Sequence, residues 1–185
     1  CDLVLVQSRA FVPQVEALGA AAQKIHYYPN SAEEVYRPIT IEPQPPSGQD
    51  LLSGVFRVAF AGNIGAAQDF ETILSAADKL RAEHDIHWNI IGDGRMQAWV
   101  ESEVRRRKLG DRVHLLGRHP IESMPRLFAL ADAMLVTLKR DPVLALTIPS
   151  KVQSYQACAR PIIAALDGEG ARVIEESGAG IAVRA

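Results

Sequence analysis

The sequence predicts an α/β protein built around a Rossmann-like, doubly wound parallel sheet. From residue 55 onward, short apolar runs rich in Val, Ile and Leu alternate with longer segments whose apolar residues recur at helical spacing. The short runs are mostly apolar and do not alternate with polar residues in a regular way, as expected of parallel strands buried on both faces. Regular alternation of strand and helix leads to right-handed crossovers and a parallel sheet covered by helices on both faces.

Five apolar runs are predicted as strands: 55–61, 87–91, 112–116, 133–138 and 161–165. Between and after them, four sets of apolar residues each fall on one face of a helix. These sets are Phe70, Ile73, Leu74, Ala77 and Leu80; Met96, Trp99, Val100 and Val104; Met124, Leu127 and Phe128; and Val152, Tyr155 and Ala159. Ligands of such sheets bind at the carboxyl ends of the strands. We therefore expect a site in the loops that follow the predicted strands.

Residues 1–30 form a smaller unit, with strands predicted at 3–6 and 25–28 and a helix at about 12–23. Residues 31–54 contain four prolines and show no hydrophobic periodicity. That composition is typical of an extended connector between two lobes. Because the chain begins with Cys-Asp-Leu-Val-Leu-Val, a strand already under way, we expect it to be a portion of a longer protein.

Composition excludes several classes of function. The net charge of −2 and the pI of about 6.2 argue against a nucleic-acid partner and against overall attraction to anionic membranes. Two cysteines far apart in sequence, Cys1 and Cys158, suit a reducing, cytoplasmic compartment. No apolar run approaches the roughly 20 residues of a membrane span. The five histidines are scattered, so no metal site is expected, and no motif for a covalent nucleophile is present.

Glycine-containing loops follow the first two strands of the regular region. Gly62, Asn63 and Gly65 come after the first strand, where glycines let a ligand approach the backbone closely. Gly92 and Asp93 come after the second, and Asp93 is placed to accept a hydrogen bond from a sugar hydroxyl. Both loops are also compatible with ordinary tight turns.

Charged residues follow the third, fourth and fifth strands. Arg118 could pair with a phosphate or stack on a base, or lie on the surface. Lys139 and Asp141 belong to a charged trio at the ligand-binding edge of the sheet, which could equally be a solvated cluster. Glu169 could reach a substrate hydroxyl, yet an acidic residue near a helix start is favourable without any ligand.

The segment Ile148-Pro-Ser-Lys-Val-Gln-Ser-Tyr155 predicts a loop followed by the first turns of a helix, with Pro149 at the first helical position. The free N–H groups of a helix start attract anions, and Lys151 adds a positive charge beside Ser150. Asp69 and Glu71 begin another helix and would repel a phosphate. The sequence therefore favours the Lys151 helix as the anion site, unless Lys151 simply points into water.

With these residues in view, the chain resembles the C-terminal half of a family-four glycosyltransferase of the two-Rossmann, GT-B type. The resemblance rests on the order and spacing of these motifs: Asp2-Leu-Val-Leu-Val, Tyr28-Pro-Asn30, Ala61-Gly-Asn-Ile-Gly65, Ile90-Ile-Gly-Asp-Gly94, Asp111-Arg-Val-His-Leu-Leu-Gly117, Leu130-Ala-Asp-Ala133 and the 148–165 segment. It implies that residues 1–30 end an N-terminal domain and that 31–54 form the interdomain linker. Residues 55–185 would be the C-terminal nucleotide-sugar-binding domain.

The sequence departs from the family pattern at several places. A basic pair usually grips the diphosphate near the first glycine loop, where Asn63 and Gln68 stand here. Two glutamates usually precede the fifth strand, and Leu146 and Ser154 occupy those positions. The second glutamate commonly holds the ribose, a task that Ser154 or Gln153 would perform more weakly.

Two further residues bear on these departures. The family's usual glycine before Arg160 is replaced by Ala159. Lys151 supplies a positive charge that could replace the missing basic pair, which favours a divergent subset of the family over a protein with altered activity.

The resemblance implies a retaining glycosyltransferase that moves a sugar from a nucleotide diphosphate to a carbohydrate or lipid-linked acceptor in cell-surface polysaccharide synthesis. No cofactor is expected, because the nucleotide sugar is a substrate. We expect a bacterial, cytoplasmic enzyme, peripherally associated with the inner face of the membrane through the N-terminal domain, and expect the isolated chain to be inactive. A non-catalytic nucleotide- or partner-binding module and a nucleotide-sugar epimerase remain the alternatives.

Overall fold

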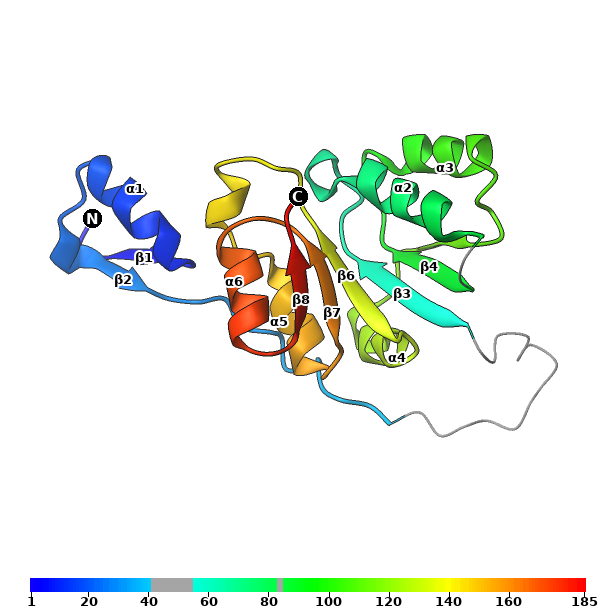
Figure 1. Cartoon of the computed structure of the whole chain (residues 1–185). Coiled ribbons are helices and arrows are strands. Elements are labelled where there is room, and N and C mark those ends of the chain that lie inside the picture. The colour runs from blue at the N-terminus through cyan, green and yellow to red at the C-terminus, as the bar shows by residue number, and fades with distance from the viewer. Residues whose placement is uncertain (41–54, 83–84) are drawn as a thin grey trace.

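The computed structural model describes residues 1–40, 55–82 and 85–185. Its main body is a parallel sheet of six strands in the order β5-β4-β3-β6-β7-β8 (Figure 1). The strands are β3 (Phe56–Ala61), β4 (Ile86–Ile91), β5 (Val113–Gly117), β6 (Ala133–Thr137), β7 (Ile162–Ala165) and β8 (Gly180–Val183). The predicted Rossmann-like fold class is thus confirmed, and the five predicted strands are all present with ends that differ by one residue at most.

The strand order reverses between β3 and β6. The chain runs outward from β3 through β4 to β5, returns to β6 beside β3, and continues to β7 and β8. At such a reversal the flanking connections leave on opposite faces, which opens a crevice at the carboxyl ends of the two central strands. The ligand-binding edge is therefore located between the loops after Ala61 and Thr137.

Helices cover both faces of the sheet. One buried core joins the sheet to α2 (Phe70–Leu80) and α3 (Gln97–Arg106), and a second core lies on the opposite face under α4 (Met124–Ala129), α5 (Ser150–Ala157) and α6 (Glu169–Glu176). The predicted stripe on α2 is buried at Phe70, Ile73, Leu74 and Ala77. The stripe on α3 is buried at Val100 and Val104, but Trp99 is 36% exposed, which corrects its predicted burial.

The N-terminal unit has a small parallel pair of strands, β1 (Val4–Val6) and β2 (Ile25–Tyr27), with α1 (Val12–Ala17) between them. The helix predicted at 12–23 is shorter than expected because Gly19 has φ +98°, outside the helical range, and a short 3-10 turn follows at Ala22–Lys24. The unit contacts the main body where the buried Ser8 Oγ donates a hydrogen bond of 3.3 Å to Glu169 Oε2.

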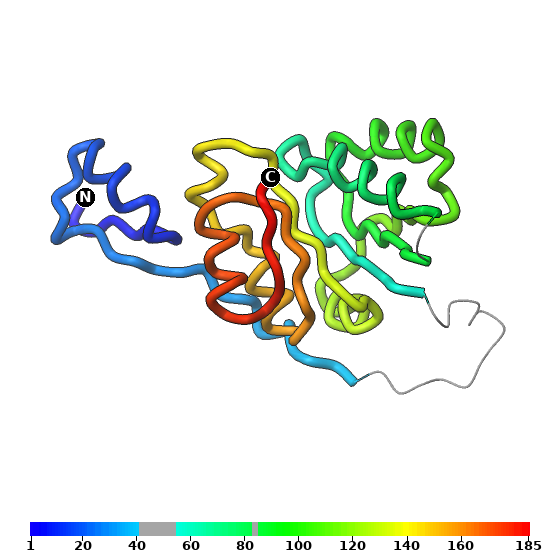
Figure 2. Tube along the Cα trace, in the orientation of Figure 1, coloured from blue at the N-terminus to red at the C-terminus, as the bar shows by residue number. Residues whose placement is uncertain are grey.

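The predicted connector 31–54 is described only as far as residue 40. Its visible part leaves β2 and runs without helix or strand beside the main body (Figure 2). There Tyr36 stacks on Phe128 of α4, with ring centroids 5.8 Å apart and planes 7° from parallel. The rest of the connector, 41–54, lies outside the described residues, as does His84.

The ends of α5 also differ from expectation. Pro149 caps the helix instead of occupying its first turn, and Ala159 lies beyond the helix end instead of on its buried stripe. Ala159 has φ +53°, and the Arg160 N–H donates to the Tyr155 carbonyl at 3.0 Å across the helix end. This left-handed ending is the one that glycine favours. It gives a physical reason for glycine at this position in the family pattern.

Replacing Ala159 with glycine is expected to stabilise the protein by about 1 kcal/mol, because glycine adopts the left-handed conformation without the steric cost of a Cβ. The melting temperature, followed by circular dichroism, should rise by roughly 2–4 °C for a chain of this size. Ala157→Gly places glycine inside the last turn of α5 and should lower the melting temperature. Equal effects of the two substitutions would contradict this account of the helix end.

Candidate functional site

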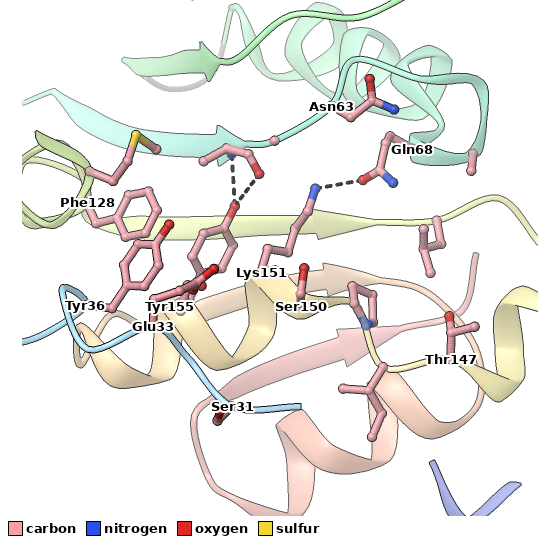
Figure 3. Close-up of a pocket in the computed structure, with 18 of the residues that line it drawn as sticks. Ser31, Glu33, Tyr36, Asn63, Gln68, Phe128, Thr147, Ser150, Lys151 and Tyr155 are labelled. Atoms are coloured by element: carbon pink, nitrogen blue, oxygen red, sulfur yellow. Dashed lines mark hydrogen bonds between the residues drawn. The ribbon is translucent and has the colours of Figure 1, made fainter. Parts of the chain in front are cut away.

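A cavity of about 490 Å³ opens at the carboxyl edge of the sheet, where the strand order reverses between β3 and β6 (Figure 3). Its walls come from the loop after β3, the start of α5, α4 and the connector that leaves the N-terminal unit. Of the predicted site residues, five line it: Gly62, Asn63, Ser150, Lys151 and Ser154. Cavities of this size suit small-molecule ligands.

A second cavity of about 530 Å³ adjoins the first over the ends of β4 and β5. Gly62, Asn63 and Tyr36 line both cavities, so the two form one continuous crevice. The second part brings in three more predicted residues, Gly92, Asp93 and Arg118. The exposed carboxylate of Asp93 lies 3.8 Å from the Arg118 guanidinium, so this end of the crevice presents a paired acid and base to solvent.

The remaining predicted residues lie elsewhere. Gly65 and Lys139 line a separate small cavity, and Asp141 and Gln153 line none of these three cavities. Asp141 Oδ1 accepts hydrogen bonds from the N–H groups of Val143 and Leu144 and thereby caps a short turn. The position of this carboxylate is therefore explained by local structure, without a ligand.

Glycine is required in these loops by close backbone packing. Gly92 has φ +128°, and a Cβ at this position would lie 2.0 Å from the Gly62 carbonyl oxygen. Gly62 has φ +136°, and its missing side chain leaves room for the Lys151 amine, which a Cβ would meet at 3.3 Å. The first glycine loop therefore makes room for Lys151, whose side chain extends past the end of β3.

Lys151 is the central polar group of the cavity. Its Nζ donates a hydrogen bond of 2.7 Å to Gln68 Oε1 (Figure 3). The same atom lies 3.7 Å from the centroid of the Phe60 ring. Burial lowers the pKa of this amine from 10.5 to about 7. Its hydrogen-bond partner is a neutral amide, and no carboxylate among the described residues forms an ion pair with it. An incoming anion would supply the missing counter-charge.

Tyr155 fixes the position of α5 against the sheet. Its fully buried hydroxyl donates to the Ala61 carbonyl at 3.2 Å and accepts from the Ala61 N–H at 2.9 Å (Figure 3). Ala61 is the last residue of β3, immediately before Gly62. One side chain on α5 thus satisfies both backbone groups at the point where the glycine loop begins.

Sequence reasoning missed the contribution of the connector. Ser31, Glu33 and Tyr36 line the first cavity, although their segment shows no periodicity or motif (Figure 3). Burial raises the pKa of the Tyr36 hydroxyl, and the nearby charge of Glu33 acts in the same direction. Gln68, which the sequence marked only as the absence of a cation, proves to be the partner of Lys151. Glu169 is held by Arg172 and Ser8, which explains its position without a ligand.

Neither metal ligands nor a membrane span is evident in the described part of the chain. Within residues 1–40, 55–82 and 85–185, no three His, Cys, Asp or Glu side chains are grouped so as to hold a metal ion. No helix among the same residues is long and apolar enough to cross a bilayer.

A six-stranded Rossmann-like sheet with a crevice at its switch point is the architecture of one half of a GT-B glycosyltransferase. The chain belongs to the family of glycosyl transferases group 1, whose model matches residues 55–185. The predicted family is therefore confirmed.

Individual relatives agree with this assignment. "Probable glycosyltransferase WbjE" of Pseudomonas aeruginosa is 36% identical over 126 residues, which cover 65% of this chain and 30% of WbjE. WcaI of Escherichia coli (strain K12), described as a colanic acid biosynthesis glycosyl transferase, is 28% identical over 159 residues, or 84% of this chain and 38% of WcaI. The chain thus spans about a third of the length of these relatives.

Solved structures show the same fold. The crystal structure of Anabaena Alr3699/HepE in complex with UDP and glucose matches all of this chain and 50% of HepE, with a TM-score of 0.78 and 18% identity. The chain therefore has the fold of half a GT-B enzyme, as predicted.

Replacing Tyr155 with phenylalanine is expected to destabilise the protein by about 1–3 kcal/mol, because it leaves both Ala61 backbone groups buried without a partner. Chemical denaturation would measure the loss. Tyr28→Phe removes the hydroxyl of a well-exposed tyrosine and should leave the free energy of unfolding unchanged. Similar small effects of both substitutions would show that the Tyr155 hydroxyl does not anchor β3.

Replacing Lys151 with methionine is expected to stabilise the protein by at least about 1 kcal/mol at neutral pH, because the charged amine must lose its hydration on folding. The folded pKa of about 7 lies below the ordinary value of 10.5, so the unfolded chain binds the proton more strongly between these values. The free energy of unfolding of the unsubstituted chain should therefore rise over that pH range.

Thermal denaturation at several pH values would test this expectation. The advantage of the Lys151→Met variant should be largest at or below pH 7, and should shrink as the pH rises. Lys79→Met, at an exposed position on α2, is the matched control and should show no such trend. A Lys151→Met variant that is less stable at all pH values would contradict the buried, uncompensated charge.

Proposed function

We propose that this chain is the donor-binding half of an enzyme that transfers a sugar from a nucleotide diphosphate to a carbohydrate or lipid-linked acceptor. The family supports transfer over the epimerase and non-catalytic alternatives. HepE was crystallised with UDP and glucose, and WbjE and WcaI are named as glycosyltransferases. The name of WcaI adds colanic acid biosynthesis, which supports a role in bacterial cell-surface polysaccharide synthesis. The acceptor would bind in the cleft between this half and a facing lobe.

The observation that carries the proposal is the buried amine of Lys151 at the switch-point crevice, with a neutral partner in Gln68. When the bond from sugar to diphosphate breaks, negative charge grows on the departing diphosphate. A cation fixed in advance in a partly dehydrated site stabilises that charge without reorganising at the moment of reaction. The first N–H groups of α5, near Ser150, have no partners within the helix and add to this stabilisation.

The rest of the crevice suits the other parts of a nucleotide sugar. Ser154, only 8% exposed, and Glu33 offer oxygen atoms in the same cavity for ribose hydroxyls. Arg118 and the loop after β5 line the adjoining part, whose volume of about 530 Å³ leaves room for a base. We assign the diphosphate to the Lys151 end, because Lys151 is the cation that lines this cavity.

The finer points of the proposal follow from the family resemblance. The transfer would retain the anomeric configuration, the enzyme would act in the cytoplasm at the inner face of the membrane, and this chain alone would be inactive because it lacks the facing lobe. Uridine nucleotides are the first donors to test, because HepE was crystallised with UDP.

Replacing Lys151 with alanine is expected to weaken binding of UDP or GDP by tenfold or more, equivalent to about 1.4 kcal/mol. Isothermal titration calorimetry on the 185-residue chain would measure the affinity. Lys139→Ala serves as the control, because Lys139 does not line the crevice and its loss should change affinity little. Unchanged affinity in the Lys151 variant would remove the basis of the proposal.

A further inference from the structure

A third cavity lies at the same edge of the sheet, on the other side of the glycine loop from Lys151. It has a volume of about 200 Å³ and lies between that loop and the starts of α2 and α3. Gly65 lines it, whereas Asn63 and Gln68 of the same loop line the crevice. A single loop therefore separates this cavity from the crevice, and a ligand bound in the cavity would lie close to a ligand bound in the crevice.

Trp99 forms an exposed aromatic wall of this cavity. Its neighbours on the helix, Val100 and Val104, are buried, while the indole is 36% exposed. At the edge of a cavity, this exposed indole offers an apolar surface that a ligand can cover. A sugar ring has an apolar face of C–H bonds that packs on an aromatic ring and an edge of hydroxyl groups that need polar partners.

Polar partners, Asp69 and Glu71, line the same cavity. Asp69 Oδ2 accepts a hydrogen bond of 2.6 Å from Thr72, and Glu71 Oε1 pairs with Arg107, so both carboxylates are held in place. Among the described residues, Asp69 Oδ1 and Glu71 Oε2 make no hydrogen bond. Each of these oxygens can accept a hydroxyl proton.

The charge of the cavity selects against an anion. Lys139 is the single cation that lines it, against the two carboxylates of Asp69 and Glu71. The Lys139 N–H donates to the Ala67 carbonyl at 2.9 Å, which fixes the residue against the glycine loop. A phosphate would be repelled there, whereas a neutral polyhydroxyl ring would find two acceptors and one donor.

We propose that this cavity binds one neutral sugar ring stacked on Trp99. The hydroxyl groups of the ring would donate hydrogen bonds to Asp69 and Glu71 and accept one from Lys139. The volume is below the roughly 300 Å³ of typical drug-sized sites, which suits one ring and not an oligosaccharide. The proposal deepens the proposed function and rests on it, since the ring would be either the acceptor sugar or the sugar of the donor.

The two tryptophans of the chain allow a direct test. Trp88 is 7% exposed in the core, and Trp99 borders the cavity, so their indole N–H signals in a 15N-labelled 185-residue chain report separately. Methyl α-glucoside, methyl α-galactoside and N-acetylglucosamine are the probes. We expect at least one of them to shift the Trp99 signal saturably while the Trp88 signal stays fixed.

Variants locate the binding. Trp99→Ala and Asp69→Asn should weaken sugar binding by tenfold or more in saturation-transfer NMR, which observes the sugar. Asparagine tolerates the left-handed backbone of Asp69, at φ +49°, so this change alters the charge and keeps the loop. Phe56→Ala, which removes another exposed aromatic at the amino end of β3, should leave sugar binding unchanged.

Further titrations separate this proposal from the proposed function. The Lys151→Met variant should lose affinity for UDP and keep its affinity for the sugar. The proposed nucleotide site and the proposed sugar site can therefore fail independently. If free sugar still binds when UDP-glucose is saturating, the ring is the acceptor's; if UDP-glucose displaces it while UDP does not, the ring is the donor's. Choline, a cation that is not a sugar, and UDP are the control ligands. The proposal is overturned if none of the three sugar probes shifts the Trp99 indole N–H signal, or if UDP or choline shifts that signal equally.

Discussion

The pairing of the Tyr155 hydroxyl with both backbone groups of Ala61 is the contact on which the site depends. It joins the middle of α5 to the last residue of β3, two elements separated by more than half of the main domain's sequence. It adds a directional contact to the core packing of Val152 and Tyr155, and so sets the start of α5 relative to the glycine loop. With it, Lys151 and Gly62 meet at the switch point, where the strand order already opens a crevice.

At that point the fold keeps the positively charged amine of Lys151 in a partly dehydrated position, which is unfavourable for the charge. Lys151 extends along the Phe60 ring and ends at an amide, so folding removes much of its water and gives back only part of what that water supplied. The uncompensated amine lowers the free energy of unfolding. A bound anion would favour its protonated, charged form. Under the proposed function, the same arrangement would supply the charge that the usual basic pair gives to a diphosphate.

The sequence was sufficient for the sheet and insufficient for details that depend on contacts between distant segments. Short, mostly apolar runs predicted the first five strands of the main sheet, but β8 is an edge strand of four residues that begins at a glycine and exposes Ile181, so it carries no such signal. The pattern placed Trp99 on a buried stripe because helical spacing alone does not show where a helix passes the end of its sheet. The pairing of Lys151 with Gln68 joins residues 83 positions apart and follows from the fold only.

Tyr36 joins the backbone that leaves the N-terminal unit to the wall of the crevice. Its ring stacks on Phe128, and the same short segment places Glu33 and Ser31 along the cavity. Three residues of one irregular segment thus form part of the crevice wall, and the stacked pair of rings holds that segment against α4. A displacement of this segment would therefore change the space that the crevice offers to a ligand.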